Sequence, residues 1–393
     1  MLQRTAVVIV LSIMIMSISG CITNHNRLKS LVSSSISLRL RKLSAMNMNM
    51  SLNKSNSSIN SNNDSGNSKN NDNTNNMNEK ENNMKKDLSY EYIDSGNRKR
   101  LERFGDQLVI RSCPSAIWEK KLSLSNEWDE SKNNTIVYEG TSGHVGKWKM
   151  NDNAIDTNNW YVKFHDYQLF SLEPSDMGQI GIFPEQEKNW QTIRTLLQKH
   201  RASSIESNVT SHTTTCVLNG FAYTGGSTTA ALGVERVEVV HLDAAKSAIE
   251  WAKRNVAMSN VHPTSKVRWI VDDCMTFLER EIKRNKKYDA LIFDPPAFGR
   301  GKGGSIWKLD KDMHSLVETF PKLLSDNPCF ILLSCHDLYW TPMRLADILQ
   351  STLRSSGYKK GRVDCGEMIL RSTRGGSSLP LGAFALWSNL SSK

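Results

Sequence analysis

The chain has 393 residues, and its 50 Lys and Arg side chains against 40 Asp and Glu give a formal net charge of +10. A hydrophobic content of 38% and a mean hydropathy of −0.46 exclude a collagen, a coiled coil and a protein that crosses a membrane many times. The first 89 residues carry 11 basic and five acidic side chains, whereas the other 304 carry 39 and 35. The folded part can therefore offer nucleic acid only a local basic patch.

Residues 1–22 form a signal-like segment. A basic start at Arg4 precedes an apolar run from Ala6 to Ile18, and small residues follow it. A helix that crosses a bilayer needs about 18 to 20 apolar residues, so this shorter run predicts a secretory signal and no stable membrane span. An apolar extension without a targeting role is the alternative.

Residues 23–89 predict a transit-like segment and an Asn-rich disordered linker. No acidic residue lies between Asn24 and Met50, and 16 of the 39 residues from Met46 to Met84 are Asn. A signal followed by a transit-like segment resembles the bipartite presequences of algae with secondary plastids. We expect an organelle, with the plastid as first choice and the mitochondrion or the secretory route as alternatives.

The cysteines predict neither a metal site nor a disulfide framework. All seven are scattered, and none forms a C-x-x-C pair. The mature protein should therefore work in a reducing compartment and need no metal.

Residues 90–180 predict a small β-rich N-terminal module. Short apolar runs alternate with polar turns at residues 107–111, 135–138 and 160–164. This pattern is typical of a compact antiparallel β structure with aromatic packing. No catalytic constellation is found in it.

Residues 181–393 predict an α/β domain, because strand and helix patterns alternate along them. The predicted helices span residues 186–200, 228–232, 246–258, 275–284, 310–324 and 341–355. The predicted strands span residues 215–221, 236–242, 266–271, 288–293 and 329–333, and residues 362–370 and 383–387 could form a final hairpin. Such alternation implies a doubly wound, largely parallel sheet, in which ligands bind at the carboxyl ends of the strands.

The first strand end carries the loop Phe221-Ala-Tyr223-Thr224-Gly225-Gly226. Two adjacent glycines at a strand-to-helix turn let the backbone approach a ligand closely. The spacing is not G-x-G-x-x-G, so NAD binding and an oxidoreductase are disfavoured. A plain tight turn is the alternative.

The second and third strand ends carry carboxylates. Asp243 is placed to accept the two hydroxyls of a ribose, and a carboxylate of Asp272-Asp273 could accept from an adenine amino group. For both, capping of the helix that follows is the competing interpretation.

The fourth strand end carries the more specific sequence Asp294-Pro295-Pro-Ala-Phe298. The prolines make a rigid loop, the acid can accept a hydrogen bond from an amine or a ring nitrogen, and Phe298 can stack on a planar base. A structural turn has no need of this combination, and its agreement with the other three loops indicates a catalytic site.

These motifs resemble the class I S-adenosylmethionine-dependent methyltransferases, and most closely their bacterial large-subunit rRNA branch. The likeness covers most of residues 90–393. It implies a Rossmann-like sheet of seven strands with the last one antiparallel, and S-adenosyl-L-methionine as cofactor. Tyr223 to Gly226 would lie along the methionine part, Asp243 at the ribose and Asp273 at the adenine. Asp294 would lie beside the methyl group and the target base.

The methylated atom is open at this point. Cys335 ends the next strand, where cytosine-C5 methyltransferases of the broader group carry a nucleophilic cysteine. The alternative is that Cys335 is a buried apolar residue. The methyl group would then be transferred directly to a nitrogen of a flipped base, which Asp294 orients and on which Phe298 stacks.

The segment after the fourth strand end is basic and glycine-rich, with Arg300, Lys302 and Lys308 as candidate phosphate contacts. A solvated loop is the alternative.

We expect an RNA methyltransferase acting on rRNA. A methyltransferase for a protein or small molecule and a non-catalytic RNA-binding protein are the rivals. The oligomeric state is open.

Overall fold

The structure, a computed structural model, describes residues 87–122, 126–140, 145–150, 159–206, 214–300, 306–337 and 339–389. The predicted signal-like segment and nearly all of the predicted transit-like segment and linker lie outside these residues, as does Lys302. Of Arg300 only the backbone is described. In this part of the chain, no helix has the length and apolar character needed to span a membrane.

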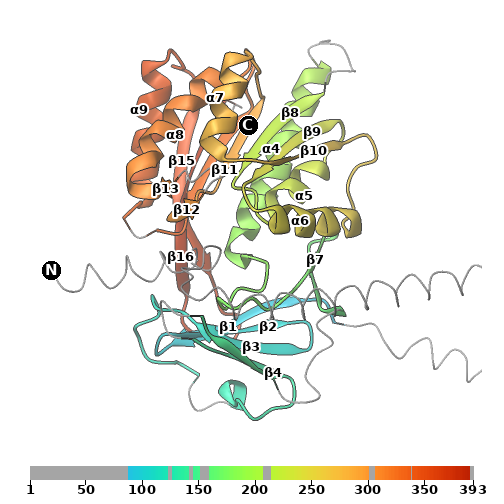
Figure 1. The fold of residues 1–393 in the computed structure, drawn as a ribbon, viewed down its shortest axis with the longest axis vertical. Helices are drawn as coiled ribbons and strands as arrows, with labels where there is room; N and C mark the ends of the chain where they lie inside the picture. Colours follow the sequence, from blue (N-terminus) through green and yellow to red (C-terminus); the bar gives the residue numbers. More distant parts are fainter. Residues whose placement is uncertain are drawn as a thin grey trace, which may run out of the picture. The chain divides into compact units, whose positions relative to one another are not determined.

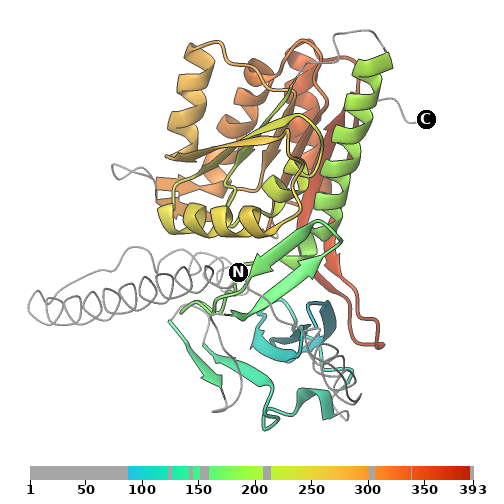
Figure 2. The same ribbon diagram turned by 90° about the vertical axis from the view of Figure 1, so that its right-hand side faces the viewer.

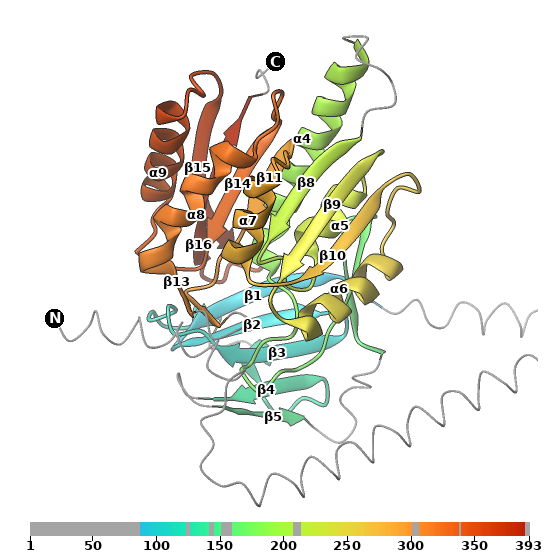
Figure 3. The same cartoon turned by 45° about the horizontal axis from the view of Figure 1, so that its top comes forward.

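A seven-stranded sheet forms the centre of the larger part of the fold (Figures 1 and 3). Its strands, in spatial order, are β10 (Lys266–Val271), β9 (Val237–Asp243), β8 (Thr215–Gly220), β11 (Ala290–Phe293), β14 (Phe330–Cys335), β16 (Leu379–Ser388) and β15 (Arg362–Leu370). The first five run parallel, and β16 is antiparallel to both of its neighbours. This confirms the predicted doubly wound sheet with an antiparallel last strand.

Helices cover both faces of this sheet (Figure 2). One face carries α4 (Glu187–Glu206), α5 (Gly226–Leu232) and α6 (Lys246–Met258), and the other carries α7 (Cys274–Lys283), α8 (Leu309–Leu323) and α9 (Pro342–Ser355).

Successive residues of a strand belong to the hydrophobic cores on opposite faces of the sheet. Phe330 and Leu332 pack with Trp190 of α4, whereas Ile331 and Leu333 pack in the cluster of the opposite helices. Neighbouring residues of a strand point to opposite faces, so the order of residues in β14 decides which side each of them meets.

The N-terminal sheet has five strands: β1 (Tyr90–Gly96), β2 (Lys99–Phe104), β3 (Gln107–Ser112), β4 (Thr135–Glu139) and β5 (Lys147–Met150). The predicted antiparallel pairing is present in three of the four strand pairs, but β3 and β4 pair in parallel. Parallel strands need a long connection. The segment between β3 and β4 is long enough for this and includes the short helix η1 (Asn126–Trp128).

A hairpin of β6 (Tyr161–Phe164) and β7 (Gln168–Ser171) lies between the N-terminal sheet and α4 in the sequence. Gln168 Nε2 donates to the Gly226 carbonyl at 2.8 Å and to Thr229 Oγ1 at 2.7 Å, so the hairpin is bonded to α5. All described residues belong to one compact unit, and the domain boundary at residue 180 stays a prediction.

The loop between β15 and β16, residues 371–378, contacts the N-terminal sheet. Arg374 Nη2 lies 2.7 Å from Glu91 Oε2, and Arg374 Nη1 lies 2.6 Å from Glu127 Oε1. The Tyr92 hydroxyl donates to the Ser377 carbonyl at 2.6 Å, and the Ser377 N–H donates to Asp94 at 2.9 Å. The last hairpin of the chain thus joins its first described sheet to the seven-stranded sheet.

Candidate active site

The loop between β8 and α5 has an unusual backbone. Phe221, Tyr223 and Gly225 all have positive φ angles, of 55°, 47° and 89°. A left-handed backbone favours glycine, and a Cβ on Gly225 would also lie 3.1 Å from the Ala252 side chain. The Thr224 hydroxyl donates to the Gly181 carbonyl at 2.7 Å. The loop is therefore held in one tight conformation at the carboxyl end of β8.

Asp243 lies beneath this loop at the end of β9. Its Oδ2 accepts from the Tyr223 N–H at 2.9 Å and its Oδ1 from the Ala245 N–H at 2.8 Å. Burial raises the pKa of the Asp243 carboxyl, although both backbone bonds act to lower it. Each carboxylate oxygen has a second lone pair. The arrangement fits a ribose that donates two hydroxyls to Asp243.

Asp273 caps α7, since its Oδ1 accepts from the Thr276 N–H at 2.9 Å. The capping alternative raised for this residue is therefore present in the structure. Its neighbour Asp272 forms an ion pair with Arg280. A role for Asp273 at the adenine stays a prediction.

Asp294 follows β11 and is held by side chains from distant parts of the chain. Gln186 Nε2 donates to Asp294 Oδ2 at 2.9 Å, and the Ser334 hydroxyl donates to Oδ1 at 2.8 Å. Asn189 in turn donates to Gln186 Oε1 at 2.7 Å, which fixes the Gln186 amide. The carboxylate is about one third exposed, at 30%. The two hydrogen bonds therefore fix the orientation of the Asp294 carboxylate, and its exposed part is open to a ligand.

His336 is the third neighbour of Asp294. Its Nε2 lies 3.7 Å from Asp294 Oδ2 and its Nδ1 lies 3.5 Å from Glu185 Oε1. Burial lowers the pKa of His336, but Asp294 and Glu185 outweigh it and raise the pKa to about 9. The imidazole is thus cationic at neutral pH. Gln186 and Glu185 were not among the predicted site residues, because neither follows a predicted strand.

Pro295 is buried, and Phe298 is half-buried in β12 (Phe298–Arg300), which pairs with β13 (Ile306–Lys308). Trp307 of β13 lies in the core and not at the surface. It is 7% exposed, its Nε1 donates to the Pro296 carbonyl at 2.6 Å, and its ring centroid lies 5.0 Å from that of Phe221. Lys308 is exposed, and its contact with RNA stays a prediction.

Cys335 lies in the apolar core. It is fully buried and belongs to the same cluster as Ile331 and Leu333, whereas Ser334 faces Asp294. Burial raises the pKa of the thiol to about 12, so the thiolate is scarce at neutral pH. These findings favour the buried apolar cysteine over the nucleophile.

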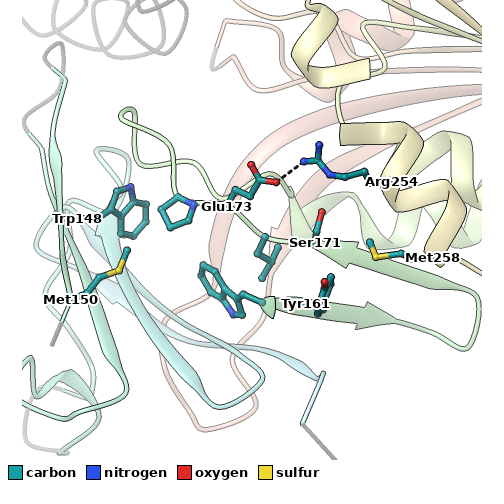
Figure 4. Close-up of a pocket in the computed structure, with 10 residues that line it drawn as sticks. Trp148, Met150, Tyr161, Ser171, Glu173, Arg254 and Met258 are labelled. Atoms are coloured by element: carbon teal, nitrogen blue, oxygen red, sulfur yellow. Dashed lines mark hydrogen bonds and ion pairs between the residues drawn. The ribbon is translucent and has the colours of Figure 1, made fainter. Parts of the chain in front are cut away.

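A separate pocket of about 570 Å³ lies among β5, β7 and α6 (Figure 4). Trp148 and Met150 line one side, and Arg254, paired with Glu173, lies opposite. None of the predicted site residues lines it. Among the described residues, no group of three or more His, Cys, Asp or Glu side chains could hold a metal ion.

Comparisons with known proteins agree with this geometry. Residues 205–354 match a family model described as S-adenosylmethionine-dependent methyltransferase. The chain is 36% identical over 110 residues to the ribosomal RNA large subunit methyltransferase K/L of Pseudoalteromonas atlantica, a match covering 28% of this chain and 15% of that protein. It is 30% identical over 148 residues to the ribosomal RNA large subunit methyltransferase I of Citrobacter koseri, covering 37% and 35%. The chain thus matches about a third or less of the length of these relatives.

Solved structures extend the likeness to the N-terminal part. A SAM dependent methyltransferase from Agrobacterium tumefaciens is similar with a TM-score of 0.67 and 27% identity, over 77% of this chain and 91% of that one. SMU.776, complexed with SAH, shares the fold at a TM-score of 0.54 and 16% identity, over 80% and 78%. Residues 205–354 therefore match the S-adenosylmethionine-dependent methyltransferases in sequence, and the chain shares the fold of a solved SAM dependent methyltransferase over 77% of its length.

Proposed function

We propose that this chain transfers the methyl group of S-adenosylmethionine to a base of RNA, with ribosomal RNA as the first substrate to test. The observation that carries the proposal is the Asp294 carboxylate, which Gln186 and Ser334 orient at the carboxyl end of β11. The names of the two curated relatives, both ribosomal RNA large subunit methyltransferases, support the choice of RNA.

Different residues would bind the cofactor and take part in methyl transfer. The bound cofactor would supply an electrophilic methyl group, with its ribose on Asp243 and its methionine part along Tyr223 to Gly226. Asp294 has lone pairs beyond those used by Gln186 and Ser334, so it can accept a hydrogen bond from an N–H of the target base. Phe298 would stack on a base turned out of the RNA. The proton released on transfer to nitrogen would leave through Asp294 or water.

The test uses the purified full chain with S-adenosylmethionine labelled in its methyl group. Wild type should label rRNA prepared from cells that lack the protein, and Asp294→Asn should not. SAH should raise the melting temperature of both proteins, and NAD should not. Label that enters protein or a small molecule but no RNA would favour the first rival. SAH binding without transfer to any acceptor would favour the non-catalytic one.

We also propose import into an organelle, with the plastid as first choice. The support is the order of a signal-like segment before a basic, acid-poor segment in residues 1–89. A fluorescent protein fused behind these residues should accumulate in the plastid. Export from the cell or a diffuse cytosolic signal would contradict the proposal.

A further inference from the structure

His336 lies in a cluster of charged groups around Asp294 and has no role in the proposed function. Asp294 approaches its Nε2 side, and Glu185 and the Leu381 carbonyl of β16 approach its Nδ1 side, at 3.7, 3.5 and 3.0 Å. The ring of Phe183 lies against it, with centroids 5.2 Å apart. The side chain of Glu185 is 2% exposed and that of His336 is 22% exposed. The imidazole is thus surrounded on three sides.

The acceptors around the ring decide its charge. The Leu381 carbonyl oxygen can only accept, so Nδ1 must carry a proton. A neutral ring with that proton would turn the Nε2 lone pair toward the Asp294 carboxylate, which is repulsive. The imidazolium instead turns an N–H toward Asp294. Among the described residues its Nε2 makes no hydrogen bond, and at 3.7 Å from Asp294 Oδ2 it acts on that carboxylate through its charge. The other titratable groups on its own segment are Cys335 and Asp337.

The N-terminal sheet supplies charge behind Glu185. Arg100 Nε and Arg111 Nε lie 3.2 and 2.7 Å from Glu102 Oε2, and all three side chains are buried. Burial acts to lower the pKa of Arg100, but Glu102 and then Glu185 outweigh it and raise the pKa. Arg111, Glu102 and Arg100 therefore form a buried cluster of alternating charge in the N-terminal sheet, and the charge of Glu185 acts on Arg100.

We propose that His336 is a positioning residue, held as an imidazolium between Asp294 and Glu185, and that it fixes the Asp294 carboxylate in the orientation needed at the target base. Arg100 interacts with Glu185 through charge from the side of the N-terminal sheet. The inference rests on the proposed function, because it is Asp294 that would meet the base.

The first test measures the charge of His336 without any reaction. NMR of the full chain labelled with ¹³C-histidine should give one resonance with a titration midpoint of about 9, assigned by its loss in His336→Gln. Asp294→Asn should lower this midpoint by at least about one unit, and Glu185→Gln by less. A midpoint near 6.5 that does not respond to Asp294→Asn would overturn the proposal.

The second test separates positioning from mere packing. His336→Gln should lower kcat for RNA about 10- to 100-fold, with KM for the cofactor unchanged and the SAH-induced rise in melting temperature retained. His336→Lys, cationic to higher pH, should keep more activity and move the alkaline limb of the pH profile upward. His314→Gln, at an exposed position of α8, is the matched control and should behave as wild type.

The outcomes distinguish the two proposals. A His336→Gln variant with wild-type kcat and pH profile would overturn the role of His336 while leaving the proposed function intact. If the wild type transfers no methyl group to RNA, the proposed function fails, and the NMR titration still decides whether His336 is the cation between two carboxylates.

Discussion

Asp243 is held by the backbone N–H groups of Tyr223 and Ala245, 20 and two residues away along the chain, whereas Asp294 is held by side chains 108 and 40 residues away. The first arrangement follows from the local conformation of two strand ends. The second exists only once η3 (Pro184–Gln186) and β14 have met β11. The proposed cofactor side of the site is thus set by backbone geometry, and the proposed transfer side by side chains that tertiary packing brings together.

The largest expected effect concerns the transfer side. Asp294→Asn keeps the size of the side chain but removes the negative charge and one acceptor oxygen. The rate of methyl transfer to RNA should fall about 10²- to 10⁴-fold, while the dissociation constant of SAH changes less than about threefold. Single-turnover rates and calorimetric binding measure the two effects. A parallel loss of SAH affinity would show that the two sides are not separable.

Asp243→Ala tests the cofactor side. It should weaken SAH binding about 10- to 100-fold, which corresponds to about 1.4 to 2.8 kcal/mol. It should also lower the free energy of unfolding by about 1 to 3 kcal/mol, because the N–H groups of Tyr223 and Ala245 lose their acceptor.

The matched control is Asp272→Asn, which removes an ion pair with a partly exposed Arg280 and should cost less than about 1 kcal/mol. Unchanged SAH affinity in Asp243→Ala would remove Asp243 from the cofactor site.

The two sides should also respond oppositely to pH. Burial lowers the pKa of His241 beneath the cofactor loop to about 3, whereas that of His336 is raised to about 9. The unfolded value for both is 6.5. The contribution of His336 to stability is complete below pH 6.5 and is lost as the pH rises through 9. That of His241 is complete above pH 6.5 and is lost as the pH falls toward 3.

The free energy of unfolding, measured by urea titration, should therefore fall in both directions from about pH 6.5, by up to about 3 kcal/mol from His336 alone. His336→Gln should flatten the alkaline limb only. An alkaline limb that stays parallel to that of the wild type would contradict the assignment.

The smallest effect is expected for Cys335→Ala. The thiol is fully buried on the face of the sheet opposite to Ser334, so transfer should stay within about threefold of wild type, with a stability loss of about 1 kcal/mol. A loss of activity above about 100-fold in a folded variant would restore the covalent route and require the strand end to open.

Much of the seven-stranded domain could be predicted from local patterns. The bounds of α6, β10 and β15 agree with those expected, since helix and strand periodicities differ clearly there. The motif after β11 and the carboxylate of Asp243 at the end of β9 were found because both directly follow apolar runs.

The partners of Asp294 could not be predicted in the same way, because Gln186 and Ser334 carry no local signal of a meeting across 148 residues. The parallel pairing of β3 with β4 likewise depends on how the intervening chain packs. One signal was overlooked: in β14, Cys335 shares the two-residue period of the buried Ile331 and Leu333, and this pattern already predicts a core position.

The contacts of the β15–β16 loop with the N-terminal sheet bear on how the protein is made. The Tyr92 hydroxyl and the Ser377 carbonyl that it contacts are 285 residues apart, and Arg374 is separated from Glu91 by 283. During synthesis these contacts can therefore form only after the last hairpin has left the ribosome. Until then the carboxylate of Asp94, buried in the finished fold, lacks the Ser377 N–H. Contacts so distant in sequence slow folding, and a chain that stops short of residue 371 leaves Glu91, Tyr92 and Asp94 without these partners.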